Sequence, residues 1–202
     1  MNIERKSFGE AYRLTIVDKV GIWLSTRRVV KLISQHNPKV IADLGCGFNA
    51  RLLRQTRSRV GRSLAVDVSL NPDLISEQIE IYTGFMPDVL NQLPSASIDL
   101  IVLNAVLEHL DDPINALKEI KRLLPPNGIL FVNVPSWFGK RILEILAFKL
   151  HLSPADEMED HRRYYNKKEL WLEIRAAGFF PSKIKVRRHK LGGAIYSIAV
   201  CE

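Results

Sequence analysis

The residues with the clearest chemical meaning lie in one glycine-rich stretch, Asp43-Leu44-Gly45-Cys46-Gly47-Phe48-Asn49-Ala50. Glycines at a strand-to-helix turn let the backbone approach a ligand, and the amides of the following helix point toward it. Asp67 lies 20 residues after Gly47 and ends a second short apolar run. A carboxylate at that strand end accepts hydrogen bonds from the hydroxyl pair of a ribose. The spacing therefore predicts a pocket for an adenosine-containing ligand. Gly-x-Gly-x-x-Ala also fits the dinucleotide fingerprint of a dehydrogenase.

Alternating strands and helices are expected to position this turn. Short apolar runs predict strands at 39–44, 63–66, 78–82, 98–104 and 129–134, and helical spacing predicts helices at 12–34, from about 50, from 113 and at 167–177. Asp112 and Pro113 supply an N-cap and a first helical residue. The runs 183–187 and 195–200, on either side of Gly192-Gly193, suggest two antiparallel strands. The chain is thus expected to form one α/β domain with a mostly parallel sheet, whose ligand crevice lies at the carboxyl ends of the strands.

Composition and charge narrow the class of protein. The chain has 202 residues, 47% hydrophobic and 25% charged, which excludes disorder and suits a single core. Residues 1–62 hold 13 Lys/Arg against 4 Asp/Glu, residues 63–160 hold 6 against 15, and residues 161–202 hold 10 against 3. Basic ends can indicate an anionic partner such as nucleic acid. A solvated face is the simpler interpretation of the five arginines between Arg51 and Arg62, because the interleaved aromatics of a stacking platform are missing.

Several segments together resemble class I S-adenosylmethionine-dependent methyltransferases, in particular the type 11 family. These are Asp43 before the glycines, the strand at 98–102, the run Val-Leu-Glu-His-Leu-Asp-Asp-Pro at 106–113 and the run His-Arg-Arg-Tyr-Tyr at 161–165. The resemblance covers about residues 38–180 and implies a Rossmann-like, seven-stranded, mostly parallel sheet. It also implies helices on both faces and an antiparallel C-terminal strand, in agreement with the two strands expected at 183–200.

The resemblance also implies a set of cofactor contacts. Asp43, Gly45 and Gly47 would cradle the methionine part of S-adenosylmethionine, with Cys46 as the small side chain that the turn requires. Asp67 would take the ribose hydroxyls and Val68 would lie beside the adenine, while Asn104 and Ala105 would line the wall near the sulfonium. Two positions depart from the family pattern. Asn49 stands for the third glycine, and Phe85 and Met86 stand where an acidic residue commonly meets adenine, so that stacking and backbone groups would hold the base.

The sequence says less about the residues that would bind the methyl acceptor. Methyl transfer from a sulfonium mainly needs alignment, and a general base helps when the nucleophile is a hydroxyl. The candidates are His109, His161 and Tyr164, with one of Tyr164 and Tyr165 expected in the core and the other exposed. For His109 the alternative is a loop-orienting role, and for His161 a solvated one. No metal is expected, because the acidic cluster 156–160 beside His161 lacks ligands from elsewhere in the chain.

We therefore predict one methyltransferase domain over 1–202 that acts on an oxygen or nitrogen of a small or medium-sized acceptor. Its parts would be an N-terminal helical cap (1–37), a cofactor-binding core (38–135), a lid and acceptor-side insertion (136–166) and a C-terminal helix and hairpin (167–202). No secretory leader or membrane-spanning run is evident, so a cytoplasmic location is expected, with peripheral membrane contact and oligomeric state left open.

Three other functions stay open at this point. A nucleic-acid methyltransferase fits the basic ends, but the chain after Asn104 lacks the Asn/Asp-Pro-Pro-aromatic motif that holds a flipped base. An NAD-dependent oxidoreductase fits the glycine fingerprint. A non-enzymatic cofactor-binding or membrane-associated module would use the apolar helix expected at 140–150, which is too short to span a bilayer.

Overall fold

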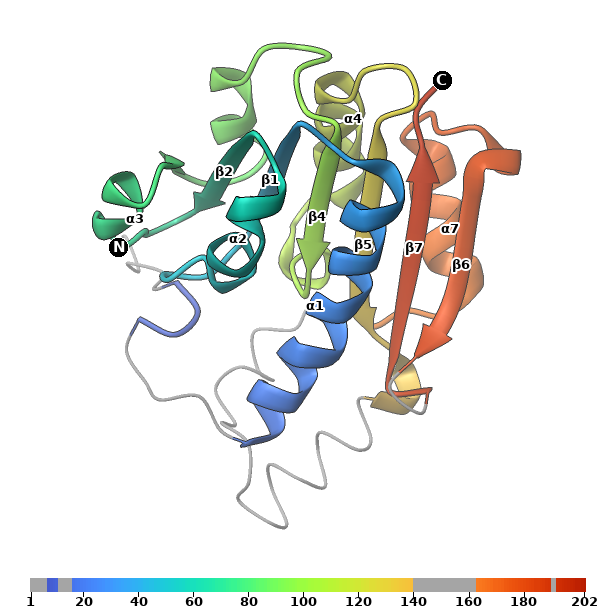
Figure 1. Ribbon diagram of the computed structural model, residues 1–202. Helices are drawn as coiled ribbons and strands as arrows, with labels where there is room; N and C mark the ends of the chain where they lie inside the picture. Colours follow the sequence, from blue (N-terminus) through green and yellow to red (C-terminus); the bar gives the residue numbers. More distant parts are fainter. Residues whose placement is uncertain (1–6, 11–15, 140–162, 190–191) are drawn as a thin grey trace, which may run out of the picture.

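A seven-stranded sheet organises the part of the chain that the computed structural model describes, which is residues 7–10, 16–139, 163–189 and 192–202 (Figure 1). The strand order is β3-β2-β1-β4-β5-β7-β6. The strands are β1 (Val40–Leu44), β2 (Arg62–Asp67), β3 (Ile79–Thr83), β4 (Leu100–Asn104), β5 (Ile129–Pro135), β6 (Ile184–His189) and β7 (Ala194–Val200). Neighbouring strands from β3 to β5 are parallel, and β7 is antiparallel to both of its neighbours. The expected fold class is confirmed, including the antiparallel C-terminal strand.

Helices cover both faces of this sheet. The longer ones are α1 (Ile16–His36), α4 (Pro113–Leu123) and α7 (Lys167–Ala176), and the short ones are α2 (Arg51–Thr56) and α3 (Asp73–Ser76). In Figure 1, α1 and α2 lie in front of the sheet, and α4 and α7 lie behind it. The helix expected from about residue 50 is real but short, because a 3-10 turn at Arg57–Arg59 follows it.

The helix boundaries follow from local side-chain chemistry. The Asp112 carboxylate accepts the backbone N–H of Asn115 at 3.0 Å and Pro113 opens α4, as the sequence predicts. At α7 the Asn166 side chain accepts the N–H groups of Lys168 and Glu169, while the Glu169 carboxylate accepts the N–H of Asn166. Such caps satisfy backbone donors that have no partner within the helix.

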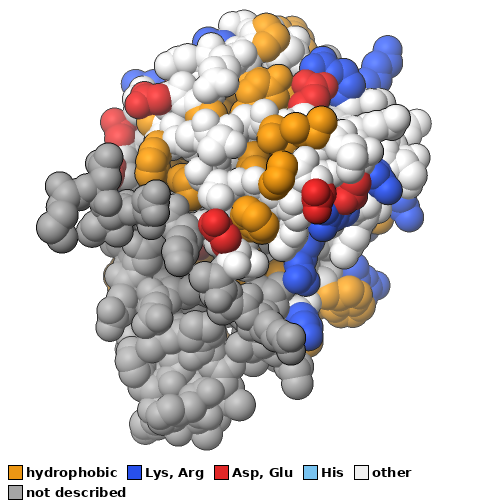
Figure 2. All heavy atoms as spheres, turned by 90° about the vertical axis from the view of Figure 1, so that its left-hand side faces the viewer, with side chains coloured by type: hydrophobic (Ala, Val, Ile, Leu, Met, Phe, Trp, Pro, Cys, Tyr) orange, Lys and Arg blue, Asp and Glu red, His pale blue; other side chains and the backbone are white. Residues whose placement is uncertain are grey.

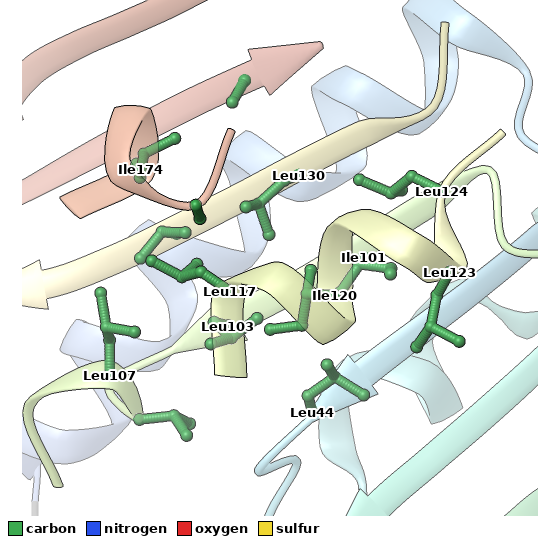
Figure 3. Packing of buried hydrophobic residues seen from close by; sticks show 14 of the residues in the cluster. Leu44, Ile101, Leu103, Leu107, Leu117, Ile120, Leu123, Leu124, Leu130 and Ile174 are labelled. Carbon is green, nitrogen blue, oxygen red and sulfur yellow. The ribbon is translucent and has the colours of Figure 1, made fainter. Parts of the chain in front are cut away.

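Two apolar layers pack against the sheet. On one face, Leu117, Ile120 and Leu123 of α4 point toward strand side chains such as Leu44 and Ile101 (Figure 3). On the other face, α1 and α2 cover the sheet with the buried side chains of Val29, Ile33 and Leu53. These pack with buried strand residues, among them Leu100, Val102 and Phe131. Burial of apolar side chains contributes about 25 cal/mol per Å². Both layers therefore hold the carboxyl ends of the strands, and the loops that follow them, in fixed relative positions.

Candidate functional site

The turn after β1 is held tightly by its surroundings. The N–H groups of Gly45 and Cys46 donate to the Val66 carbonyl on β2, at 2.7 and 3.3 Å. Gly45 and Gly47 both have φ +73°, a conformation that favours glycine. A Cβ added at Gly45 would lie 2.3 Å from Cγ2 of Val106, in the loop after β4. Glycine is therefore needed here both for the backbone conformation and for space.

Asp67 at the end of β2 is tied to this turn through its carboxylate. Oδ2 accepts the N–H of Gly47 at 2.8 Å, and Oδ1 accepts the N–H of Val68 at 2.8 Å. A carboxylate offers about four lone-pair sites, so two backbone bonds leave each oxygen able to accept a further donor. Asp67 and Val68 are half-buried, at the carboxyl edge of the sheet.

Asp43 carries a buried carboxyl group beneath the same turn. It is 4% exposed, and burial, with a further contribution from the charge of Asp67, raises its pKa to about 7. The thiol of Cys46 is raised in pKa by burial and then by Asp43 and Asp67, and it donates to the Gly47 carbonyl at 3.4 Å. This corner of the site thus disfavours further negative charge and favours the approach of a cationic group.

The N-terminal segment 7–10 covers this turn, a contact that the sequence does not predict. The Phe8 carbonyl accepts the N–H of Phe48 at 3.0 Å, and a Cβ on Gly47 would lie 3.0 Å from that carbonyl oxygen. Glu10 accepts the hydroxyl of Ser69, after β2, at 3.3 Å. Ser7 to Glu10 therefore joins the loops after β1 and β2 from a distant part of the sequence.

The loop after β3 differs from the loops after β1 and β2. Phe85 is 60% exposed, and Met86 is half-buried against the core layer under α4 and α7. Asn49, which replaces the third glycine, accepts the Asn71 side-chain amide at 3.2 Å, while Asn71 donates its N–H to the Phe48 carbonyl. Asn49 thus links the glycine turn to the loop after β2.

Amide side chains meet at the carboxyl ends of β4 and β5. Asn104 and Asn133 are cross-strand partners, and the Asn133 amide nitrogen donates to Oδ1 of Asn104 at 2.8 Å. Ala105 turns the chain with φ +60° and donates its N–H to the Asn133 carbonyl at 2.8 Å. The imidazole of His189, at the end of β6, hydrogen-bonds Oδ1 of Asn133. Asn133 and His189 are additions to the predicted site.

The three candidate bases, His109, Tyr164 and His161, differ in where they lie in the structure. His109 is half-buried in the 3-10 turn Leu107–His109 after β4, close in sequence to Asn104. Tyr164 is buried, with its ring centroid 5.7 Å from that of Trp137. Tyr165 is buried as well and donates its hydroxyl to Glu173 at 3.0 Å, so the expectation of one core and one exposed tyrosine is wrong. Tyr165 is buried because it pairs with Ser136 and packs in the core layer under α4 and α7, whereas Tyr164 packs against Trp137. His161 and the helix expected at 140–150 lie outside the described residues.

Three arginines of the basic flank are paired with acids. Arg54 and Arg57 contact Glu77 at 2.7 and 3.5 Å, and Arg62 contacts Glu80 at 2.8 Å. On the face seen in Figure 2, basic and acidic side chains lie among hydrophobic ones instead of forming one basic field. These pairs support the interpretation of this flank as a solvated face.

Neither a metal site nor a membrane span emerges from the described ranges. Within them, three or more His, Cys, Asp or Glu side chains nowhere come together as metal ligands would. The acidic cluster at 156–160 lies outside these ranges. Across the same residues, helices are too short or too polar to cross a bilayer.

Fold and site together define a class of protein. An all-parallel dinucleotide-binding sheet has the order 3-2-1-4-5-6, whereas here an antiparallel β7 is inserted between β5 and β6. This topology, with a glycine turn after β1 and an acid at the end of β2, is that of the class I S-adenosylmethionine-dependent methyltransferases. The chain belongs to the methyltransferase domain family, whose profile matches residues 25–180. S-Adenosylmethionine is the cofactor of this class, and the oxidoreductase alternative loses its support.

Similar proteins agree with this assignment. Trans-aconitate 2-methyltransferase from Escherichia coli O17:K52:H18 is 32% identical over 117 residues, which are 54% of this chain and 46% of that protein. The same enzyme from Escherichia coli O1:K1 is 34% identical over 107 residues, or 51% and 42% of the two chains. The match thus spans less than half the length of these relatives.

Solved structures share the fold at low sequence identity. A SAM-dependent methyltransferase from Archaeoglobus fulgidus has a TM-score of 0.64 at 15% identity, with 88% of this chain and 93% of that chain covered. A Thermotoga maritima SAM-dependent methyltransferase, titled a possible histamine N-methyltransferase, has a TM-score of 0.59 at 18% identity, with 93% and 96% covered. At such identities the likeness concerns the fold alone.

Proposed function

We propose that this chain transfers the methyl group of S-adenosylmethionine to a nucleophilic oxygen or nitrogen of a small or medium-sized molecule, with a carboxylate oxygen as the favoured target. The observation that carries the cofactor half of this proposal is the Asp67 carboxylate, fixed by two backbone N–H groups beside the glycine turn. Names of relatives point to a small acidic acceptor, since the two E. coli proteins are trans-aconitate methyltransferases.

The residues present fit the cofactor. Asp67 would accept the two ribose hydroxyls at its remaining lone-pair sites, and Val68, the next residue, would lie beside the adenine. The turn at Gly45, Cys46 and Gly47 would lie beside the methionine part, and buried Asp43 suits its positive charge. When bound, S-adenosylmethionine supplies a methyl group already activated on a sulfonium.

Two further pairs of residues complete the proposed cofactor pocket. Phe85 and Met86 after β3 would hold the adenine by stacking and packing, in place of the missing acid. Asn104 and Ala105 at the end of β4 would form the wall between cofactor and acceptor. Both pairs follow the carboxyl ends of parallel strands, with β2 and β1 between them, and this placement supports these roles.

The chain's own task is then to align the acceptor and exclude water. A carboxylate oxygen is ionised at neutral pH and needs no base, so His109 and Tyr164 would orient the acceptor instead of deprotonating it. His161 would join them if the segment 136–166 forms the acceptor side, as the predicted division of the chain has it. With a hydroxyl or amine acceptor, one of these three would have to take a proton.

Calorimetric titration with S-adenosylhomocysteine tests the cofactor half. Micromolar binding, about −8 kcal/mol, should be lost in Asp67→Ala and absent for NAD. Binding of NAD alone would refute the proposal. Methyl transfer from isotope-labelled S-adenosylmethionine is then measured to trans-aconitate, to histamine and to an RNA transcript. Label in RNA only would favour the nucleic-acid alternative, and label in histamine only would exclude a carboxylate target.

A further inference from the structure

A buried polar row runs across the sheet under α1, at the carboxyl ends of β4 and β5. Asn133 is 3% exposed in a strand whose neighbouring residues, Val132 and Val134, are fully buried valines. Its side chain contacts Asn104 on β4, Ser25 on α1 and His189 on β6. A polar group buried in an apolar layer costs free energy unless it is hydrogen-bonded, so the arrangement of donors in this row is fixed.

Ser25 decides which way the Asn133 amide points. The Ser25 hydroxyl donates to the Gly21 carbonyl at 3.1 Å, so its oxygen can only accept from Asn133. The Asn133 atom beside it, at 3.5 Å, must therefore be the amide nitrogen. The same nitrogen donates at 2.8 Å to Asn104, whose facing atom must be Oδ1.

The opposite end of the row fixes the proton on His189. Oδ1 of Asn133 faces Nε2 of His189, and an amide oxygen only accepts, so Nε2 must carry a hydrogen. His189 is 7% exposed, and its ring meets that of Tyr196 edge-on at 5.4 Å between centroids. The row thus has one direction, from the His189 N–H through Asn133 to the oxygen of Asn104.

This direction leaves the amide nitrogen of Asn104 as the outer end of the row. Asn104 is half-buried at the carboxyl end of β4, and within the described residues its nitrogen has no hydrogen-bond partner. We propose that Asn133 and His189 are positioning residues that hold the Asn104 amide with two N–H donors toward the acceptor, so that the site selects an oxygen-rich, anionic acceptor over an amine. This inference rests on the proposed methyl-transfer function.

The chemistry of the row explains the selection. An N–H donor that faces a carboxylate forms a charge-assisted hydrogen bond, which is about twice as strong as a neutral one. A protonated amine would instead bring N–H groups against N–H groups. Arg28 adds positive charge nearby, because its guanidinium lies 4.4 Å from the Tyr196 ring centroid and donates to the Tyr196 hydroxyl at 3.1 Å.

Two substitutions at Asn133 distinguish the effect of turning the Asn104 amide from the effect of adding a negative charge. In Asn133→Asp the new carboxylate can only accept, so Asn104 must turn its nitrogen inward and its oxygen toward the acceptor. In Asn133→Leu the donor is lost without any added charge. Ser197→Ala is the matched control, since it removes a buried hydroxyl from β7 that has no hydrogen-bond partner among the described residues.

The measurement is the affinity of protein saturated with S-adenosylhomocysteine for trans-aconitate and for histamine, which requires no turnover. Wild type should prefer trans-aconitate, and both Asn133 variants should weaken its binding by about 10-fold or more. S-Adenosylhomocysteine affinity should stay within about 2-fold of wild type, which also reports that the variants are folded. Ser197→Ala should change neither affinity.

Histidine spectroscopy tests the row without any acceptor. In protein labelled with ¹⁵N-histidine, the His189 signal, identified by its loss in His189→Gln, should show a protonated Nε2. His189→Gln should keep the preference for trans-aconitate because glutamine can also donate to Oδ1 of Asn133, whereas His189→Leu should reduce it.

Each contrary result points to a specific step. An unprotonated Nε2, a preference for histamine, or a loss confined to Asn133→Asp would overturn the inference and leave the methyl-transfer proposal standing. Failure of wild type to bind S-adenosylhomocysteine would instead defeat the proposed function, and the Nε2 signal would then decide the orientation of the row alone.

Discussion

The two halves of the candidate site contain different chemical groups. Around β1 and β2, backbone N–H groups and two carboxylates form the site, within a stretch of 25 residues from Asp43 to Asp67. Around β4, β5 and β6, neutral amides and an imidazole do so, from residues 29 and 56 positions apart in the chain. We call the first the cofactor half and the second the acceptor half, after their proposed roles. The cofactor half suits a ligand shared by the whole class, since backbone geometry survives many side-chain changes. The second half can change its specificity through single side chains.

Gly45→Ala should have the largest effect on stability, because it disrupts the glycine turn of the cofactor half directly. The new Cβ meets Val106 at 2.3 Å in a backbone conformation with φ +73°. Overpacking and left-handed strain together should destabilise the protein by about 3 kcal/mol. Urea unfolding measures this loss, and S-adenosylhomocysteine affinity should fall with it.

Gly9→Ala is the control for the Gly45 variant, since Gly9 has φ +77° but no neighbour within 4 Å of an added Cβ. It should lose only about 1 kcal/mol. Adding Val106→Ala to Gly45→Ala should restore part of the lost stability. Equal losses for the two glycine variants would mean that backbone strain alone matters at Gly45.

The buried carboxyl of Asp43, in the cofactor half, should make the stability of the protein depend on pH near neutrality. Its pKa is about 7 in the folded protein against 3.8 for a free aspartate, so the folded state binds the proton more tightly than the unfolded state. Stability should therefore rise as pH falls from about 8 toward about 5. Asp43→Asn should be more stable than wild type at the upper end and lose that advantage at the lower end.

Thermal unfolding at several pH values checks the Asp43 prediction. Asp88→Asn, at an exposed position, is the control for one lost carboxylate. Asp67→Asn should move the transition to lower pH, because the Asp67 charge contributes to the raised pKa of Asp43. A wild-type profile that matches the Asp43→Asn profile would show that this carboxyl is not the group responsible.

Arg28→Ala should destabilise the acceptor half and leave cofactor binding in the other half unchanged. The substitution removes a hydrogen bond and a cation–π contact to Tyr196, which joins α1 to β7. We expect about 1 kcal/mol of lost stability and unchanged S-adenosylhomocysteine affinity. Arg27→Ala, on the same helix, removes a contact to the exposed Trp23 ring and should cost less than about 0.5 kcal/mol. A parallel loss of cofactor affinity in Arg28→Ala would show that the halves are coupled.

The same contrast explains what the sequence could predict. The glycine turn, Asp67 and the Asp112-Pro113 cap are local, because backbone conformation and capping depend on residues a few positions apart. The strand order could be predicted only through resemblance to a family. The antiparallel hairpin was evident from its own alternating pattern and its glycines.

The contacts that the sequence did not predict join residues far apart in the chain. Nothing near Phe8 in the sequence indicates that its carbonyl meets the N–H of Phe48. Asn133 did carry a signal, as a polar residue inside an apolar strand, but its partners could be named only once β5 was known to lie between β4 and β7. His189 joins the row because β7 pairs with both β5 and β6, so that only one strand separates His189 from Asn133.

Phe85 offers the smallest and most selective test of the cofactor half. Its ring is 60% exposed, so Phe85→Ala should leave the unfolding midpoint almost unchanged. If the ring stacks on adenine in place of the missing acid, its loss should weaken S-adenosylhomocysteine binding by about 3- to 10-fold, the range of one aromatic contact. Phe180→Ala is the matched control, because that ring is 55% exposed just before β6 begins, at the opposite end of the strand from His189. Wild-type affinity in both variants would mean that the Phe85 ring makes no adenine contact, and that contact would then fall to Met86 and backbone groups.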